Sequence, residues 1–207
     1  MSRFPHLCVI TLMDQGSDSA LLSRLRDGDT AAFDEVHALL NARLFSFLLR
    51  LSRRRDVAED LLEETWLRLV THAKRLRPDT QLSPWLFTVA RNLYVSYQRS
   101  RLLEDSHAAT LIGLWPGGTT RLSPFEETAT NETARRIESA LASLPATYRE
   151  VLLLVSVEGF RPAEAAGVCG ISPEAFRQRL HRARALLARR LDAPADATMS
   201  TLKEVTT

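Results

Sequence analysis

Apolar residues recur at spacings of three and four along the chain from Ser19 to Arg101. This spacing puts them on one face of an α-helix, and neither the alternation typical of strands nor hairpin turns interrupt it. A long helix is predicted from Thr30 to Ser52, with a buried face made of Phe33, Val36, Leu40, Leu44, Phe47 and Leu51. The pattern therefore predicts several packed helices.

Two further helices have marked starts. One is predicted to begin at Asp56, because Asp56 and Glu59 have the spacing of a capping box. Another is predicted to open at Ser83, an N-cap that Pro84 follows at the first helical position, and to continue towards Arg101. The residues that the first of these helices is expected to bury are Val57, Leu61, Thr65 and Leu69.

The helical pattern fails between Glu104 and Thr130, where prolines and paired glycines indicate a loop. It resumes near Asn131, and Pro145 opens an apolar helix that ends at Gly159. We therefore predict an all-α protein with two small helical domains joined by a flexible linker. The expected limits are an N-terminal extension (1–18), a first domain (19–103), the linker (104–130), a second domain (131–192) and a disordered tail (193–207).

The second domain is predicted to end in a helix-turn-helix. A short helix from Pro162 to Cys169 is followed by a turn at Gly170. Ser172 then caps a helix from Pro173 to Leu191, which is basic on the face opposite its apolar side chains. The expected packing face consists of Phe176, Leu180, Ala183 and Leu187. The basic face is predicted to bind DNA, and the alternative is a solvated arginine face.

The basic helix offers two kinds of DNA contact. Its first half is the part that a helix-turn-helix inserts into the major groove, where Arg suits guanine edges and Gln suits adenine edges. The expected base contacts are Arg177, Gln178 and Arg182. The expected phosphate contacts, which add affinity without sequence preference, are Arg179, His181 and Arg184.

A second set of candidate residues lies between Pro84 and Arg101. Here Trp85, Phe87, Tyr94 and Tyr97 are interleaved with Arg91, Asn92, Gln98, Arg99 and Arg101. Aromatic rings together with arginines suit unstacked, single-stranded bases. Packing in the core is the alternative: it is favoured for Trp85, and it is as well supported as nucleic-acid binding for Arg91, Asn92 and Tyr94.

An acidic cluster follows the basic run from Arg53 to Arg55. Its members are Asp56, Glu59, Asp60, Glu63 and Glu64. Acidic side chains near a helix start interact favourably with the helix dipole. Spacing alone therefore favours a local, stabilising role over a partner-binding role.

Composition and motif spacing exclude several classes of protein. The net charge is only +2 across 207 residues, and Cys8 and Cys169 form no bridge framework, which fits a reducing cytoplasm. The apolar stretch from Leu7 to Met13 is too short for a membrane span. No spacing indicates a metal site, a cofactor loop or a catalytic triad, so we expect neither an enzyme nor a cofactor.

Several motifs in order resemble the extracytoplasmic-function sigma factors of the sigma-70 family. The first half carries Arg26-Asp27-Gly28-Asp29, Asp56-Val57-Ala58-Glu59-Asp60-Leu61, Pro84-Trp85-Leu86 and Ala90-Arg91-Asn92-Leu93. The second half carries Leu144-Pro145, Arg149-Glu150-Val151-Leu152, Glu158-Gly159, Gly170-Ile171-Ser172 and Arg179-Leu180-His181-Arg182-Ala183-Arg184. The resemblance covers nearly everything from Ser19 to Leu191 except the linker.

This resemblance implies a function and partners. Such proteins bind core RNA polymerase and recognise the −10 and −35 promoter elements, as duplex and as melted non-template strand, and many are held by an anti-sigma factor. It assigns the acidic cluster to polymerase docking, in place of the local role. The segment from Arg77 to Ser83 and the aromatic helix are assigned to the nearer element, and the basic helix to the farther one. The apolar residues from Leu111 to Trp115 would thread through the polymerase or join the domains.

Two alternatives to a sigma factor remain. An ordinary helix-turn-helix regulator would leave the first domain unexplained. A sigma-like decoy that sequesters an anti-sigma factor would need no intact basic helix. Departures from the family pattern at Ser96, Phe176 and Gln178 affect the expected promoter sequence, and Gly167 is unfavourable inside the first helix of the motif.

Overall fold

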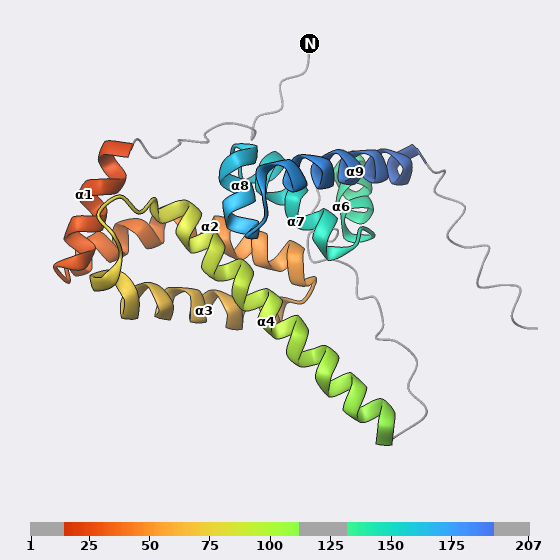
Figure 1. Ribbon diagram of the computed structural model, residues 1–207, viewed down its shortest axis with the longest axis horizontal. Helices are drawn as coiled ribbons and strands as arrows, with labels where there is room; N and C mark the ends of the chain where they lie inside the picture. The colour runs from red at the N-terminus through yellow and green to blue at the C-terminus, as the bar shows by residue number, and fades with distance from the viewer. Residues whose placement is uncertain (1–14, 112–131, 193–207) are drawn as a thin grey trace, which may run out of the picture.

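The computed structural model describes residues 15–111 and 132–192, and within these ranges the chain forms helices and connecting turns only (Figure 1). The N-terminal bundle consists of α1 (Gln15–Arg26), α2 (Thr30–Ser52), α3 (Arg55–His72), the short 3-10 turn η1 (Ala73–Arg75) and α4 (Leu82–Leu111). The C-terminal bundle consists of α6 (Glu132–Ala142), α7 (Ala146–Leu152), the π-helical turn η2 (Leu153–Val157), α8 (Pro162–Cys169) and α9 (Pro173–Asp192). The predicted all-α fold is confirmed.

Helix α2 matches its prediction at both ends. The Asp29 side chain caps the helix by accepting a hydrogen bond from the Ala31 amide at 2.9 Å. Gly28, with φ +84°, makes the turn that precedes the cap. The expected core face is confirmed, because Val36, Leu40, Leu44, Phe47 and Leu51 are buried and Phe33 packs against them.

The capping box predicted for α3 is wrong. The N-cap is Arg54, and the Asp56 carboxylate pairs with the Arg54 guanidinium instead of capping the helix. Glu59 pairs with Arg55 at 2.8 Å. The run of arginines offers these acids nearer partners than the backbone amides. The predicted buried face of Val57, Leu61, Thr65 and Leu69 is nevertheless confirmed.

Helix α4 is longer than its pattern predicts. It starts at Leu82, one residue before the expected cap, where the Trp85 amide donates to the Gln81 carbonyl at 3.1 Å. It ends at Leu111, beyond the point at which a loop is expected, and its second half projects from the bundle (Figure 1). Residues 104–111 lose the apolar periodicity but contain no proline or glycine, so nothing in them breaks the helix. The rest of the expected linker lies outside the described residues.

The helix-turn-helix is confirmed in the C-terminal bundle. Helix α8 starts at Pro162, and the Glu164 side chain accepts a hydrogen bond from the Arg161 amide at 2.8 Å. Gly170 ends α8 with φ +65°, a left-handed conformation that glycine adopts without strain. The Ser172 hydroxyl then accepts a hydrogen bond from the Ala175 amide at 3.1 Å and caps α9.

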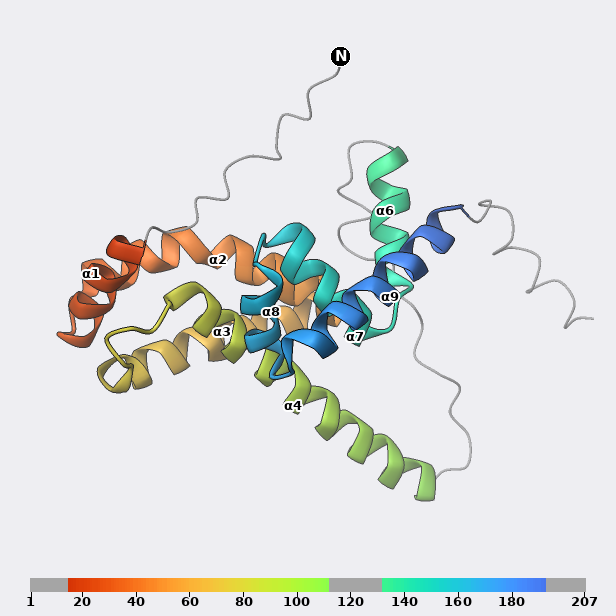
Figure 2. The same cartoon turned by 45° about the horizontal axis from the view of Figure 1, so that its top comes forward.

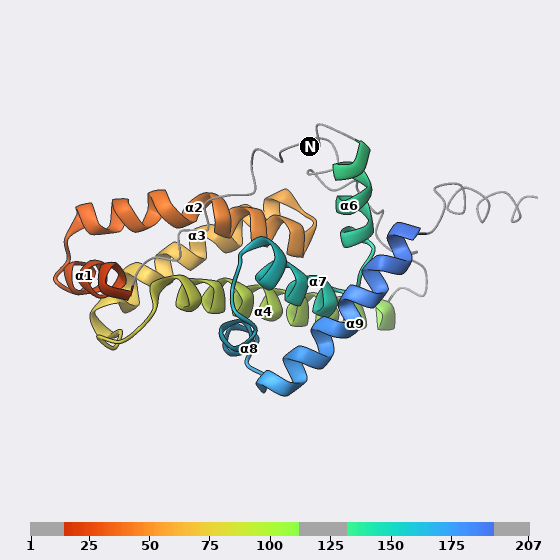
Figure 3. The same cartoon turned by 90° about the horizontal axis from the view of Figure 1, so that it is seen from above.

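The two bundles pack against each other. Helix α8 packs across α4, and α7 contacts α2 (Figure 3). The Phe87 ring of α4 meets Phe47 of α2 at 5.3 Å between centroids and Phe160 of the C-terminal bundle at 5.0 Å, both edge to face. The apolar core is therefore continuous from one bundle to the other.

Candidate functional site

Helix α9 separates its packing face from its basic face. Phe176, Leu180 and Ala183 are buried against the bundle. The opposite side carries a shallow depression lined by Glu174, Arg177, Gln178, His181 and Arg182. Figure 2 shows α9 on the outside of the C-terminal bundle. The residues expected to contact base edges are thus gathered on one exposed surface.

The remaining basic residues of α9 differ in exposure. Arg184 is exposed, whereas Arg179 is half-buried beside the packing face. Glu174 forms an ion pair with Arg177 at 2.9 Å, and both side chains are about two-thirds exposed. The pair has the i, i+3 spacing that brings side chains together on a helix. In this structure the Arg177 guanidinium therefore lies beside Glu174 on the basic face, in an exposed pair that contributes little stability.

The candidate residues of α4 divide into two groups. Asn92, Arg99 and Arg101 are exposed along the helix. Trp85 packs against the core, and Tyr94 is 5% exposed. The Gln98 amide donates a hydrogen bond to the Tyr94 hydroxyl, and burial raises the pKa of Tyr94. In this structure Tyr94 is buried in the core and Trp85 is partly buried against it, which agrees with the packing alternative that the sequence left open.

Arg91 of α4 is held by the other bundle. Its guanidinium donates to the Glu150 carboxylate at 2.6 Å and to the Asn92 side chain at 3.2 Å. Glu150 lies on α7 and its side chain is 6% exposed. Among the described residues, Arg91 is therefore the one candidate for nucleic-acid binding on α4 that has an ion-pair partner.

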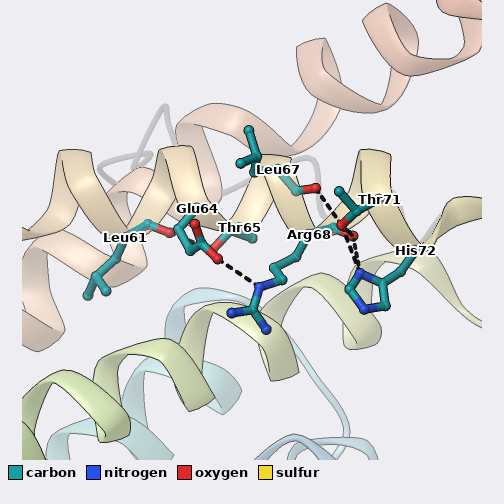
Figure 4. A network of polar contacts seen from close by, with 7 residues as sticks. All are labelled: Leu61, Glu64, Thr65, Leu67, Arg68, Thr71 and His72. Carbon is teal, nitrogen blue, oxygen red and sulfur yellow. Dashed lines mark hydrogen bonds and ion pairs between the residues drawn. The ribbon is translucent and has the colours of Figure 1, made fainter.

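The acidic cluster lies on the exposed side of α3, except for the half-buried Glu64. Glu64 pairs with Arg68 at 2.7 Å, next to the hydrogen bonds that join Thr71 and His72 to the turn before them (Figure 4). A hydrogen bond from Arg54 lowers the pKa of Asp56. Asp60 and Glu63 have no ion-pair partner in the described part of the chain. These two carboxylates are the ones most available to a basic partner.

Two apolar residues of α3 extend the acidic surface. Leu67 is 56% exposed and Val70 is 61% exposed. They follow Glu63 at spacings of four and seven, so the three side chains share one face. The sequence analysis did not single out Leu67 and Val70. It could have found them as apolar residues outside the buried face of α3, which consists of Val57, Leu61, Thr65 and Leu69.

Buried charged residues occur in α7 and just after it. Burial lowers the pKa of Arg149 to about 10, which leaves its guanidinium charged at neutral pH. Burial also raises the pKa of the Glu158 carboxyl, against the opposing effect of Arg43. The Cys169 thiol has a pKa raised to about 12 by burial, so it is not a reactive thiolate. Sequence reasoning assigned no role to Arg149 and Glu158 beyond the family motifs.

Neither a metal centre nor a membrane span is present in the described ranges. Among those residues, no three His, Cys, Asp or Glu side chains come close enough to hold an ion. Within residues 15–111 and 132–192, no helix has the length and hydrophobicity needed to cross a bilayer. The chemistry of the site is therefore that of charged surfaces and exposed helices.

Comparisons with known proteins point to one family. Residues 39–102 match sigma-70 region 2, and residues 134–187 match sigma-70 region 4. The chain is 35% identical to the ECF RNA polymerase sigma factor EcfG of Rhodopseudomonas palustris over 172 residues, which cover 81% of this chain and 85% of that protein. It is 33% identical to the sigma factor CarQ of Myxococcus xanthus, covering 78% and 90% of the two chains.

A solved structure has the same fold. It is the sigma factor RpoE in complex with the anti-sigma factor NepR from Bartonella quintana, which matches with a TM-score of 0.64 at 27% identity, over 77% of this chain and 96% of that one. The two matched regions also correspond to the two bundles, in the order that the sequence motifs predict. The chain therefore belongs to the extracytoplasmic-function RNA polymerase sigma factors of the sigma-70 family.

Proposed function

We propose that this chain directs core RNA polymerase to promoters by reading the nearer element with α4 and the farther element with α9. As a member of its family it binds core RNA polymerase and promoter DNA, and it acts in transcription initiation without catalysing a reaction itself. The observation that carries the proposal is the basic face of α9, exposed opposite the buried Phe176, Leu180 and Ala183. Residues 19–103 and 131–192 would serve as the two promoter-reading domains.

The basic face of α9 fits the major groove. The depression between Arg177, Gln178, His181 and Arg182 offers donors at the start of the helix, where a helix-turn-helix meets base edges. An Arg or Gln in bidentate contact with the correct base discriminates by about 1–3 kcal/mol. Arg179, His181 and Arg184 would hold the phosphates on either side.

The exposed face of α4 suits the nearer element. Asn92, Arg99 and Arg101 lie open along this helix, and the segment from Arg77 to Ser83 leads into it. Stacking and cationic contacts of this kind suit melted DNA. Arg91 and Tyr94 would join these contacts only after the packing around them changes, whereas Trp85 is partly exposed at the start of α4.

The outer face of α3 is proposed as the polymerase-docking surface. It combines Asp60 and Glu63 with the exposed Leu67 and Val70. Carboxylates steer a basic partner, and apolar side chains at the centre of a contact provide much of its binding energy. Asp56, Glu59 and Glu64 would add to the charge, since their ion pairs are local and exposed.

An anti-sigma factor is a further candidate partner. The RpoE relative is solved in complex with such a protein, and 77% of this chain matches it. We therefore propose that an anti-sigma factor binds this chain, which would act in the cytoplasm alongside the polymerase.

The experiment that tests the function is transcription in vitro from the protein's own upstream DNA with bacterial core polymerase. We expect a discrete start that depends on the protein. A triple variant with Arg177→Ala, Gln178→Ala and Arg182→Ala should still co-elute with polymerase but lose that start, because these exposed residues of α9 are not part of the docking surface proposed on α3.

Other outcomes identify other functions. Specific duplex binding without any protein-dependent transcript would indicate an ordinary helix-turn-helix regulator. Tight binding to an anti-sigma factor, again without a transcript, would indicate a decoy.

A further inference from the structure

One acidic side chain lies on the basic face of α9. Between Pro173 and Leu191 the sequence contains six arginines and a single acid, Glu174. Glu174 lies in the first turn of α9 and lines the same depression as Arg177 and Arg182. This end of α9 is at the outer edge of the molecule (Figure 3). The surface proposed to read DNA therefore contains a carboxylate to which the base and phosphate contacts assigned above give no role.

No strong contact ties the Glu174 side chain to the rest of the fold. Its carboxylate pairs with the Arg177 guanidinium at 2.9 Å, and the two side chains are 67% and 65% exposed. An exposed pair of this kind contributes little to stability, because water screens the attraction and both side chains lose freedom. The side-chain cap of the helix comes from Ser172, whose hydroxyl accepts a hydrogen bond from the Ala175 amide at 3.1 Å. Glu174 can therefore exchange its partner for DNA at little cost in stability.

A local role is the alternative to a role in recognition. A carboxylate in the first turn of a helix interacts favourably with the helix dipole. This interaction alone predicts that removing the charge changes the stability of the helix start. It predicts no change in the preference of α9 for one base over another, so the two roles differ in what they affect.

A carboxylate that faces DNA is unfavourable unless it meets a hydrogen-bond donor. The phosphates repel it, and so do guanine O6 and thymine O4, which are acceptors in the major groove. Adenine presents its N6 donor beside the N7 acceptor, whereas the N4 amino group of cytosine is a donor that glutamate accepts from. DNA that closes over Glu174 without such a donor leaves an unpaired charge out of water. The side chain therefore selects cytosine partly by penalising the other bases.

The neighbouring arginine supplies the complementary chemistry. Arg177 follows Glu174 by three positions, so the two side chains lie on one side of the helix. A guanidinium matches guanine O6 and N7. A G·C base pair presents these two acceptors and the cytosine N4 donor along one edge in the major groove. Together the two side chains complement one such base pair, or two adjacent ones.

We propose that Glu174 determines specificity by selecting cytosine at, or directly next to, the base pair that Arg177 contacts in the farther promoter element. On binding, the Glu174 carboxylate accepts a hydrogen bond from the cytosine amino group, and Arg177 donates to guanine. This inference rests on the function proposed for α9 and adds the base that the start of the helix selects. Glu174 also weakens binding to other sequences, because its charge opposes the attraction between the arginines and the phosphates where no cytosine compensates it.

Glu174→Gln separates recognition from the local role. The amide keeps the size of the side chain but offers both a donor and an acceptor, which suit adenine N7 and N6. Glu174→Ala removes the contact altogether. Asp192→Asn is the matched control, because it makes the same change from acid to amide at an exposed position at the other end of α9.

The measurement is the selection of duplexes by the complete holoenzyme. Core polymerase with each full-length protein binds the protein's own upstream DNA, in which the farther element upstream of the mapped start is randomised, and the bound DNA is sequenced. We expect the wild type to prefer cytosine over thymine about ten-fold at one position. Glu174→Gln should prefer adenine there, and Glu174→Ala should accept all four bases about equally. The other positions, and every position in Asp192→Asn, should keep the wild-type preference.

Two further measurements locate the contact and its charge effect. Arg177→Ala should lose the guanine preference at the position that Arg177 reads, and this position should coincide with, or adjoin, the one that changes in Glu174→Gln. Positions that are not adjacent would overturn the shared contact. Holoenzyme with Glu174→Ala should bind a scrambled duplex more tightly than the wild type does, because one repulsive charge is gone.

Contrary results distinguish this inference from the function on which it rests. If Glu174→Ala keeps the cytosine preference, or Glu174→Gln still selects cytosine, the role of Glu174 in recognition is overturned. Loss of preference at every position in Glu174→Ala would assign the residue to the helix start and overturn it too. A wild type that selects bases elsewhere in the element, but no cytosine beside the Arg177 position, would overturn the inference and leave the proposed function standing. A wild type without preference anywhere in the element would overturn the function proposed for α9 and the inference with it.

Discussion

At the scale of single residues, we propose that the arginines of α9 divide into base contacts and phosphate contacts. Arg182 lines the exposed depression, whereas Arg184 lies farther along the helix. We expect Arg182→Ala to lose about 1–3 kcal/mol of discrimination at one base pair. Arg184→Ala should weaken binding to all sequences and reduce the slope of log affinity against log salt by about 1. Affinities for the promoter duplex and its single-base variants, measured at two salt concentrations, test both expectations.

The matched control for this pair is Arg190→Ala, an exposed arginine in the last turn of α9. It removes the same charge without touching the depression. If Arg182→Ala and Arg184→Ala relax base preference equally, the division into base and phosphate contacts is wrong.

How far the residue roles could be predicted depends on whether the signal is local. The basic face of α9 follows from helical periodicity, because Phe176, Leu180 and Ala183 fix the buried side. The environment of Arg91 cannot be predicted from periodicity, because its partner Glu150 lies 59 positions away in the sequence. A contact over that distance leaves no periodic pattern in the sequence.

At the scale of helices, the start of α9 depends on one hydroxyl. The Ser172 side chain accepts the Ala175 amide hydrogen bond at 3.1 Å, which satisfies an otherwise unpaired donor of the first turn. Ser172→Ala should lower the free energy of unfolding by about 1 kcal/mol, measured by urea denaturation. Ser172→Asp should retain most of it, because a carboxylate caps equally well. Equal stability of Ser172→Ala and the wild type would show that this cap contributes nothing.

Helix boundaries were predictable where a carboxylate kept one oxygen for the helix backbone. Asp29 accepts from the Ala31 amide with one oxygen while its other oxygen pairs with Arg24, and α2 starts where the pattern predicts. Asp56 is different, because Arg54 lies two positions before it and donates to both of its oxygens. At the end of α4 the apolar periodicity stops, but no proline or glycine follows before Leu111, so the helix continues to that residue.

At the scale of the whole molecule, the sequence predicted two helical bundles but not their contact. The arginines and glutamates that join them are ordinary surface residues in each bundle taken alone. Only the fold brings Arg43 to Glu158, 115 positions away. The packing of one bundle against the other is therefore a property of the tertiary structure and cannot be predicted from a local sequence pattern.

Arg149 tests whether the bundles are energetically coupled. Replacing it by Met keeps much of the side-chain length but leaves carbonyls unpaired at the ends of both α2 and α6. We expect a loss of about 3 kcal/mol in the free energy of unfolding, because stranded buried acceptors carry a desolvation cost. Hydrogen exchange should accelerate at the end of α2 as well as in α6, since one side chain caps both.

Arg149→Lys is the control variant that keeps the positive charge but loses the planar guanidinium. A lysine ammonium has three donors on one nitrogen and cannot reach carbonyls on both sides as a planar guanidinium does. Its stability should therefore lie between those of the wild type and Arg149→Met. Faster exchange confined to α6, with the end of α2 unchanged, would mean that Arg149 stabilises the C-terminal bundle alone. Acceleration in both helices would mean that a single residue of α7 couples the stability of the two bundles.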